Sequence, residues 1–175
     1  MTAPLDAVPL ARRITEQAYR AGASLVTTLY SDDEALLARF RYAPDEAFDK
    51  AAGWLYDGMG AAYRSGAARL AITGASPLLL SSQDPGKVGR ANQAVSKAYR
   101  PALELITHHE INWTIVACAT PAWAASVCPD LPPDQAVNRL WDAIFAASRA
   151  DLDAPIAAWK QHYAGLHRRA DVLNA

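Results

Sequence analysis

The sequence has no apolar run that approaches the roughly 20 residues needed to cross a lipid bilayer. Residues 1–6 contain no basic stretch followed by an apolar core, so a signal peptide is not predicted. We therefore expect a cytoplasmic protein with no membrane partner.

Cysteine is scarce: Cys118 and Cys128 are the two in the chain, and neither has a nearby Cys or His partner in the sequence. This pair does not suit a zinc site, and reduced structural thiols are expected. An excess of positive charge is also missing, because 17 basic residues face 18 acidic ones and the net charge is −1. Nucleic-acid binding, which usually needs a basic face, is therefore not expected.

Motifs that would reveal a catalytic site are missing as well. No Gly-rich run ends in Lys-Ser or Lys-Thr, and the glycines at 53, 58 and 60 do not follow the dinucleotide-binding order. A Gly-x-Ser-x-Gly turn is not present either. A Ser-His-Asp triad stays open, because its members need not be close in sequence.

What the sequence does contain is an alternation of strand and helix patterns. Apolar, β-branched segments predict buried strands at residues 24–30, 69–73 and 111–118. Spacings of three and four residues predict helices at residues 7–21, 85–108 and 154–169, with a broken helical region over 44–63. The five tryptophans are expected to pack between helices and sheet. The pattern indicates one α/β domain over residues 1–175, with a mainly parallel sheet and helices on both faces.

The beginning of the chain departs from this pattern. A helix at residues 7–21 of a doubly wound domain is usually fed by a strand, and no strand pattern precedes it. We therefore expect the first strand to be missing, which would leave a sheet edge unpaired.

Two polar clusters are candidates for chemistry. His108, His109 and Glu110 are adjacent, so on a helix the two imidazoles point about 100° apart and cannot share one ion. A structural role at a helix C-terminus is the favoured interpretation. Residues 31–34 follow a predicted strand, where open α/β sheets place ligands. A capping box with Ser31 at the N-cap is the favoured alternative for that cluster.

Several stretches occur in a fixed order along the chain. They are Ala3-Pro4-Leu5, residues 18–23, Tyr30-Ser31-Asp32-Asp33-Glu34, Glu110-Ile111-Asn112-Trp113, residues 120–124, and residues 129–133 leading to Leu140-Trp141. As an ordered set they resemble the N-terminal domain of the thermophilic-type metallo-aminopeptidases, the group of aminopeptidase T and AmpS, over roughly residues 3–175.

The resemblance implies a two-domain enzyme that removes N-terminal residues from peptide substrates with two divalent metal ions, such as Zn, Co or Mg. It also implies a homodimer with an enclosed cavity. The metal ligands of the family belong to the second domain, so none is carried over to this chain, and the four histidines match no family ligand. The chain is expected to be a fragment or a truncated gene product without the catalytic C-terminal domain, and inactive by itself.

In the full-length enzyme this domain is expected to help shape or close the cavity, with Asp32, Asp33 and Trp113 as the candidate residues. The alternative is a non-enzymatic α/β binding or interaction module that uses the carboxyl edge of the sheet near residues 31–33 and 120–121.

Overall fold

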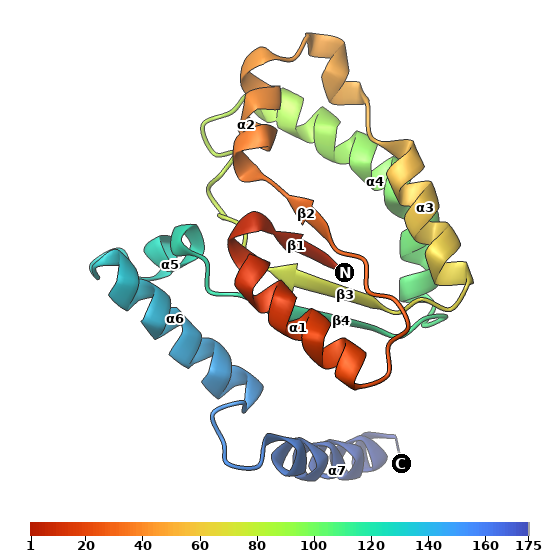
Figure 1. The fold of residues 1–175 in the computed structure, drawn as a ribbon, viewed down its shortest axis with the longest axis vertical. Helices are drawn as coiled ribbons and strands as arrows, with labels where there is room; N and C mark the ends of the chain where they lie inside the picture. The colour runs from red at the N-terminus through yellow and green to blue at the C-terminus, as the bar shows by residue number, and fades with distance from the viewer. Residues whose placement is uncertain (175) are drawn as a thin grey trace.

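The computed structural model describes residues 1–174, which form a four-stranded parallel sheet flanked by helices (Figure 1). The strand order is β2-β1-β3-β4, and every adjacent pair is parallel. The strands are β1 (Thr2–Pro4), β2 (Leu29–Ser31), β3 (Arg69–Thr73) and β4 (Trp113–Ala117). The predicted α/β class with a parallel sheet is confirmed.

The helices connect the strands and extend beyond the last one. Two of them are short 3₁₀ helices, and the other seven are α-helices of 7–23 residues. In chain order they are η1 (Leu5–Ala7), α1 (Val8–Arg20), α2 (Asp33–Tyr42), η2 (Asp45–Asp49), α3 (Gly53–Arg64), α4 (Pro85–Thr107), α5 (Pro121–Val127), α6 (Pro133–Ser148) and α7 (Pro155–Leu173).

Helices cover both faces of the sheet, as expected. On one face Ala7 and Ala11 of the η1–α1 segment pack with Ile72 of β3, and Trp141 of α6 joins this cluster. Successive strand residues point to opposite faces, and Arg69 of β3 approaches Tyr63 of α3 on the other side. Burial, and then the neighbouring Tyr99 of α4, raise the pKa of Tyr63 to about 12.

The expectation of a missing first strand is wrong, because residues Thr2–Pro4 form β1 at the centre of the sheet. Thr2 is in register with Leu29 of β2 on one side and with Ala71 of β3 on the other. The Leu29 N–H donates to the Met1 carbonyl at 2.9 Å and extends this pairing by one residue. Three residues are too few to show the alternation that identifies a strand in a sequence.

The second strand is shorter than predicted. Residues 24–28 lie outside β2, and the Leu25 side chain is 77% exposed rather than buried. Part of this segment is held by a side chain, because the Val26 N–H donates to the Tyr19 hydroxyl at 3.1 Å. The β-branched residues of this segment favour a strand. However, β2 pairs with β1, which is only three residues long, so residues 24–28 have no partner in the sheet.

The tryptophans divide into two groups. Trp123 and Trp141 pack against buried residues, as predicted. Trp54, by contrast, is 77% exposed on α3, and Trp113 and Trp159 are also exposed, so the expectation that all five pack inside is wrong. Much of the core consists of alanine instead, for example Ala102 of α4 and Ala124 of α5. Small residues let helices approach closely, which leaves less buried volume for large rings.

Candidate functional site

A hollow lies at the carboxyl ends of the central strands and has a volume of about 420 Å³. The chain leaves β1 toward β2 and leaves β3 toward β4, so the connections diverge between β1 and β3. Open α/β sheets bind ligands outside the carboxyl ends of the strands at this kind of divergence. The lining residues are Thr2, Ala3, Pro4, Ser31, Ile72, Thr73, Gly74, Ala75 and Trp123.

One wall of the hollow is a tight junction between the loops that follow β3 and β4. The buried Thr120 hydroxyl donates a hydrogen bond to the Gly74 carbonyl oxygen. The same hydroxyl accepts from the Trp123 N–H at 3.3 Å and so caps α5, the helix that carries the Trp123 ring to the hollow. A Cβ atom at Gly74 would collide with the Cys118 carbonyl oxygen, so the close approach of the two loops requires glycine.

Carboxylates follow β2 at the same edge of the sheet. Asp32 is the N-cap of α2, and its Oδ1 accepts from the N–H groups of Glu34 at 2.9 Å and Ala35 at 3.3 Å. The prediction of Ser31 as the cap is therefore wrong by one residue, because Ser31 is still paired in β2. Capping explains the position of Asp32 without any ligand.

The Asp33 carboxyl is affected by burial and by several nearby charges. Partial burial raises the pKa of the Asp33 carboxyl above its ordinary value, and the negative charge of Asp6 raises it further. The adjacent carboxylates at 32 and 34 act in the same direction. Asp6 also raises the pKa of the Cys118 thiol, after the larger effect of burial. The edge of the sheet near the hollow therefore carries a concentration of negative charge.

The structure does not bring Trp113 together with Asp32 and Asp33. Trp113 begins β4, whereas Asp32 and Asp33 follow the end of β2, and the two strands are parallel. The ring thus lies at the amino edge of the sheet and the carboxylates at the carboxyl edge. Its side chain is 43% exposed on an edge strand.

The polar cluster at residues 108–110 lies at the end of α4, where the sequence predicts it. His108 is the C-cap of the helix, and His109 adopts a left-handed backbone conformation with φ of 57°. His108 Nδ1 lies 3.8 Å from a Glu110 carboxylate oxygen in an exposed pair. Within residues 1–174 no group of three or more His, Cys, Asp or Glu side chains is arranged to hold a metal ion.

Sequence reasoning identified only part of this hollow. Thr120 and Pro121 are predicted at the carboxyl edge and lie there, but neither lines the hollow, and of residues 31–33 only Ser31 does. Gly74 and Trp123 were missed as lining residues. Gly74 directly follows the predicted strand at residues 69–73. Trp123 lies three residues after Thr120, the N-cap of the helix that follows the predicted strand at residues 111–118. Both positions could therefore have been derived from the end of a strand.

The family model of the thermophilic metalloproteases (M29) matches residues 1–175. The chain is similar to aminopeptidase T of Thermus thermophilus, with 53% identity over 99% of this chain, and to aminopeptidase T of Thermus aquaticus, with 49% identity over 99%. Aminopeptidase 2 of Geobacillus stearothermophilus is 37% identical over the same share of the chain.

A solved structure, wild-type AmpT from Thermus thermophilus, matches this fold with a TM-score of 0.93 and 51% identity over 99% of this chain. The chain spans only 43% of the Thermus thermophilus relative and 42% of the Thermus aquaticus one. The match covers the whole of this sequence, and the chain belongs to the thermophilic metalloprotease family M29.

Proposed function

We propose that this chain is the N-terminal domain of a metal-dependent aminopeptidase that removes N-terminal residues from peptides. The observation that carries the proposal is the family match over residues 1–175, together with 53% identity to an aminopeptidase of which the chain covers 43%. The hollow at the carboxyl edge of the sheet supports it, because it offers this domain a surface on which to border a substrate cavity.

The metal that the family name implies does not fit the side chains of this domain. The described part of the chain lacks a set of three His, Cys, Asp or Glu residues that could bind it. We therefore propose that a second domain supplies the ligands of two divalent ions, Zn, Co or Mg. The contribution of this domain is to shape or close the cavity.

Asp32 and Asp33 are the proposed cavity residues of this domain. They follow Ser31, which lines the hollow, and burial, followed by the negative charges of Asp6, Asp32 and Glu34, raises the pKa of Asp33. A negative edge would attract the ammonium group at the N-terminus of a peptide substrate. Trp113 would border the same cavity only if the cavity continued around the free edge of β4.

The test compares the isolated chain with a hybrid enzyme, in which residues 1–175 replace the matching part of Thermus thermophilus aminopeptidase T. Both are assayed on aminoacyl anilides with added zinc, cobalt or magnesium, and with a chelator as the control. We expect metal-dependent turnover by the hybrid only. Metal-dependent turnover by the isolated chain would refute the proposal that the ligands lie elsewhere.

Within the hybrid, the double substitution Asp32→Ala and Asp33→Ala tests the cavity role. We expect the double variant to have an increased KM. The control is Asp57→Ala on α3, which removes an acidic residue away from the sheet edge. Unchanged kinetics in the double variant would leave Asp32 and Asp33 as capping residues. Circular dichroism of each variant checks that α2 persists after loss of its cap.

The remaining proposals concern assembly and location. Among the described residues no helix is both long and apolar enough to cross a membrane. We propose a cytoplasmic homodimer for the full-length enzyme, which sedimentation of the hybrid would check.

The second candidate function is a non-enzymatic interaction module that uses the carboxyl edge of the sheet near residues 31–33 and 120–121, and the hollow at this edge is the observation that favours it. This candidate loses its basis if the reading frame continues past residue 175 into a segment rich in Glu, His and Asp.

A further inference from the structure

The helix α7 presents an apolar stripe that nothing in residues 1–174 buries. No residue of α7 is buried, although it is 19 residues long. Ile156 is 74% exposed, Tyr163 58% and Leu173 86%. The exposed apolar residues that share one face of this helix, at intervals of three, four or seven, are Ile156, Trp159, Tyr163, Leu166 and Leu173. A stripe at this spacing is typical of a helix that packs against another element.

The orientation of α7 is set by contacts with the end of α6. Arg149 ends α6 in a left-handed conformation, and its guanidinium lies over the Trp159 ring at 5.7 Å. The Trp159 indole N–H donates to the Ser148 carbonyl at 2.8 Å. Figure 1 shows α7 set apart from the sheet, beyond the end of α6. The stripe is therefore held in place before any partner binds, which lowers the entropy cost of binding.

The flanks of the stripe are not acidic. The positions beside it are occupied by Lys160 and His167 on one side and by His162 and Arg169 on the other, while the one acidic residue of α7 is Asp171. If a second copy of α7 packed along the stripe, its flanks would offer no acidic partner to Lys160 or Arg169 in either orientation. Complementary charge therefore does not favour pairing of two copies.

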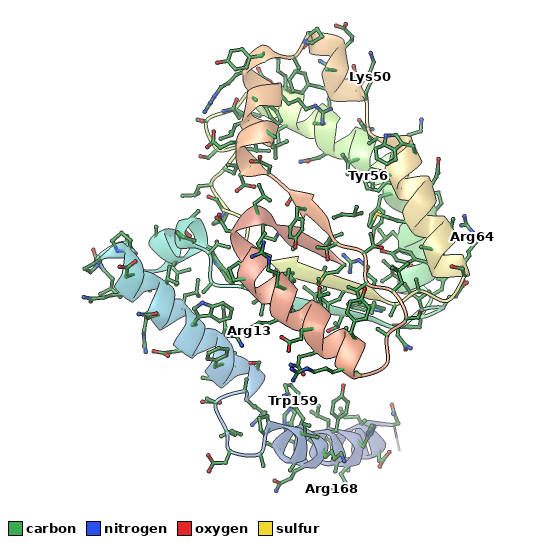
Figure 2. The ribbon with its side chains drawn as sticks, in the orientation of Figure 1. Arg13, Lys50, Tyr56, Arg64, Trp159 and Arg168 are labelled. Atoms are coloured by element: carbon green, nitrogen blue, oxygen red, sulfur yellow. The ribbon has the colours of Figure 1, made fainter. Side chains whose placement is uncertain are left out.

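A second hollow beside the stripe extends this positive surface. It has a volume of about 420 Å³ and runs from Leu166 around α7 to Arg168. Arg149 and Arg169 also line it, and Arg149 lies 3.4 Å from His162 Nδ1. Figure 2 shows Trp159 and Arg168 projecting from opposite sides of α7. The acids of the preceding loop, Asp151 and Asp153, do not line this hollow.

We propose that α7 is a docking helix for the remainder of the full-length polypeptide, the part that the relatives have beyond the matched 43%. Its stripe packs against an apolar surface of that part, and a carboxylate of that part enters the arginine-lined hollow beside Leu166. This inference rests on the proposed function, because it requires a second domain. The size of the unmatched part and the charge of the flanks both favour this occupant over a second copy of the chain.

The experiment measures hydrogen exchange of α7 peptides in the isolated chain and in the hybrid with aminopeptidase T. We expect exchange in the hybrid to be at least about tenfold slower, which corresponds to ~1.4 kcal/mol of local stabilisation. The double variant Tyr163→Glu and Leu166→Glu should abolish this protection. The matched control, Ala157→Glu and Ala164→Glu, adds the same charge to exposed positions off the stripe and should retain it.

A third variant tests the charged part of the proposal. Arg169→Glu reverses one charge of the hollow and should reduce the protection of α7, while unchanged protection would refute the entry of a carboxylate. Circular dichroism of each isolated variant checks that α7 still forms, so a loss of protection in the hybrid reports docking.

Three results would overturn the proposal of a docking helix. The first is equal hydrogen exchange of α7 in the isolated chain and in a folded hybrid. The second is an equal effect of the stripe and control variants on the protection of α7, and the third is a dimer of the isolated chain that the stripe variant dissociates. The experiment distinguishes failure of the docking proposal from failure of the proposed function. A protected α7 in a hybrid without peptidase activity rejects the proposed function, whereas an active hybrid with an unprotected α7 rejects only the docking.

Discussion

Replacing Gly74 with alanine should destabilise the protein through one defined collision. The added Cβ would clash with the Cys118 carbonyl oxygen and lie 2.9 Å from Thr120 Cγ2. Neither neighbour can move easily, because the Cys118 N–H donates to the Thr73 carbonyl at 2.7 Å and Thr120 is buried. The loops that follow β3 and β4 must therefore separate.

The magnitude has two sources. Overpacking a tight site costs ~1–3 kcal/mol. Separation of the loops also weakens the bond from the Thr120 hydroxyl to the Gly74 carbonyl, and leaving a buried polar group without its partner costs ~1–3 kcal/mol. Because the shift that breaks the bond relieves part of the collision, we expect a total loss of about 2–4 kcal/mol in the free energy of unfolding.

Urea unfolding followed by circular dichroism measures this loss, and Gly89→Ala is the matched control. A Cβ at Gly89 would meet no atom within 4 Å, and this glycine lies inside α4. The same chemical change should therefore stabilise the protein there by ~0.5–1 kcal/mol. If the two variants changed stability equally, the close approach of the two loops would not be the reason for glycine at 74.

The remaining predictions concern the helices around the sheet. Phe48→Ala removes a fully buried ring and should cost ~3–5 kcal/mol, measured by urea unfolding, and a cost below 1 kcal/mol would contradict the burial. Asp32→Ala should cost ~1 kcal/mol through loss of the α2 cap, whereas Asp32→Asn should retain most of the stability. The hydrogen bond from Arg90 lowers the pKa of Asp49 below 3.8, so this pair stabilises the fold above that pH and the stabilisation is lost as the pH falls through the folded pKa. The difference in urea midpoint between the wild type and Arg90→Met should therefore shrink between pH 5 and pH 3, and a constant difference would argue against the ion pair.

How much of the fold the sequence predicts depends on how local the signal is. The strand at residues 69–73 is predicted with both bounds, because its apolar run is bordered by Gly66 and Gly74. The strand at residues 2–4 is missed, because it is recognisable only from its pairing with β2 and β3, more than 25 residues away along the chain. Pairing between distant segments leaves no period in three residues.

The candidate site shows the same limit. The carboxylates at 32 and 33 are predicted at the end of a strand, where they are found. Their separation from Trp113 is not predictable from the residue types, since it depends on which end of each strand the residues occupy. The exposure of Trp54 likewise depends on what packs against its face of α3, and none of the described residues buries the ring.

The central position of β1 has a consequence for synthesis on the ribosome. Its partner β3 ends at Thr73, so the first three paired residues of the chain must wait for about seventy more before the sheet can close across them. During that interval Ala3, which is buried in the finished sheet, remains open to water or to other chains. Non-local pairing of this kind slows folding. The centre of the sheet is therefore expected to form late, after β3 has emerged from the ribosome.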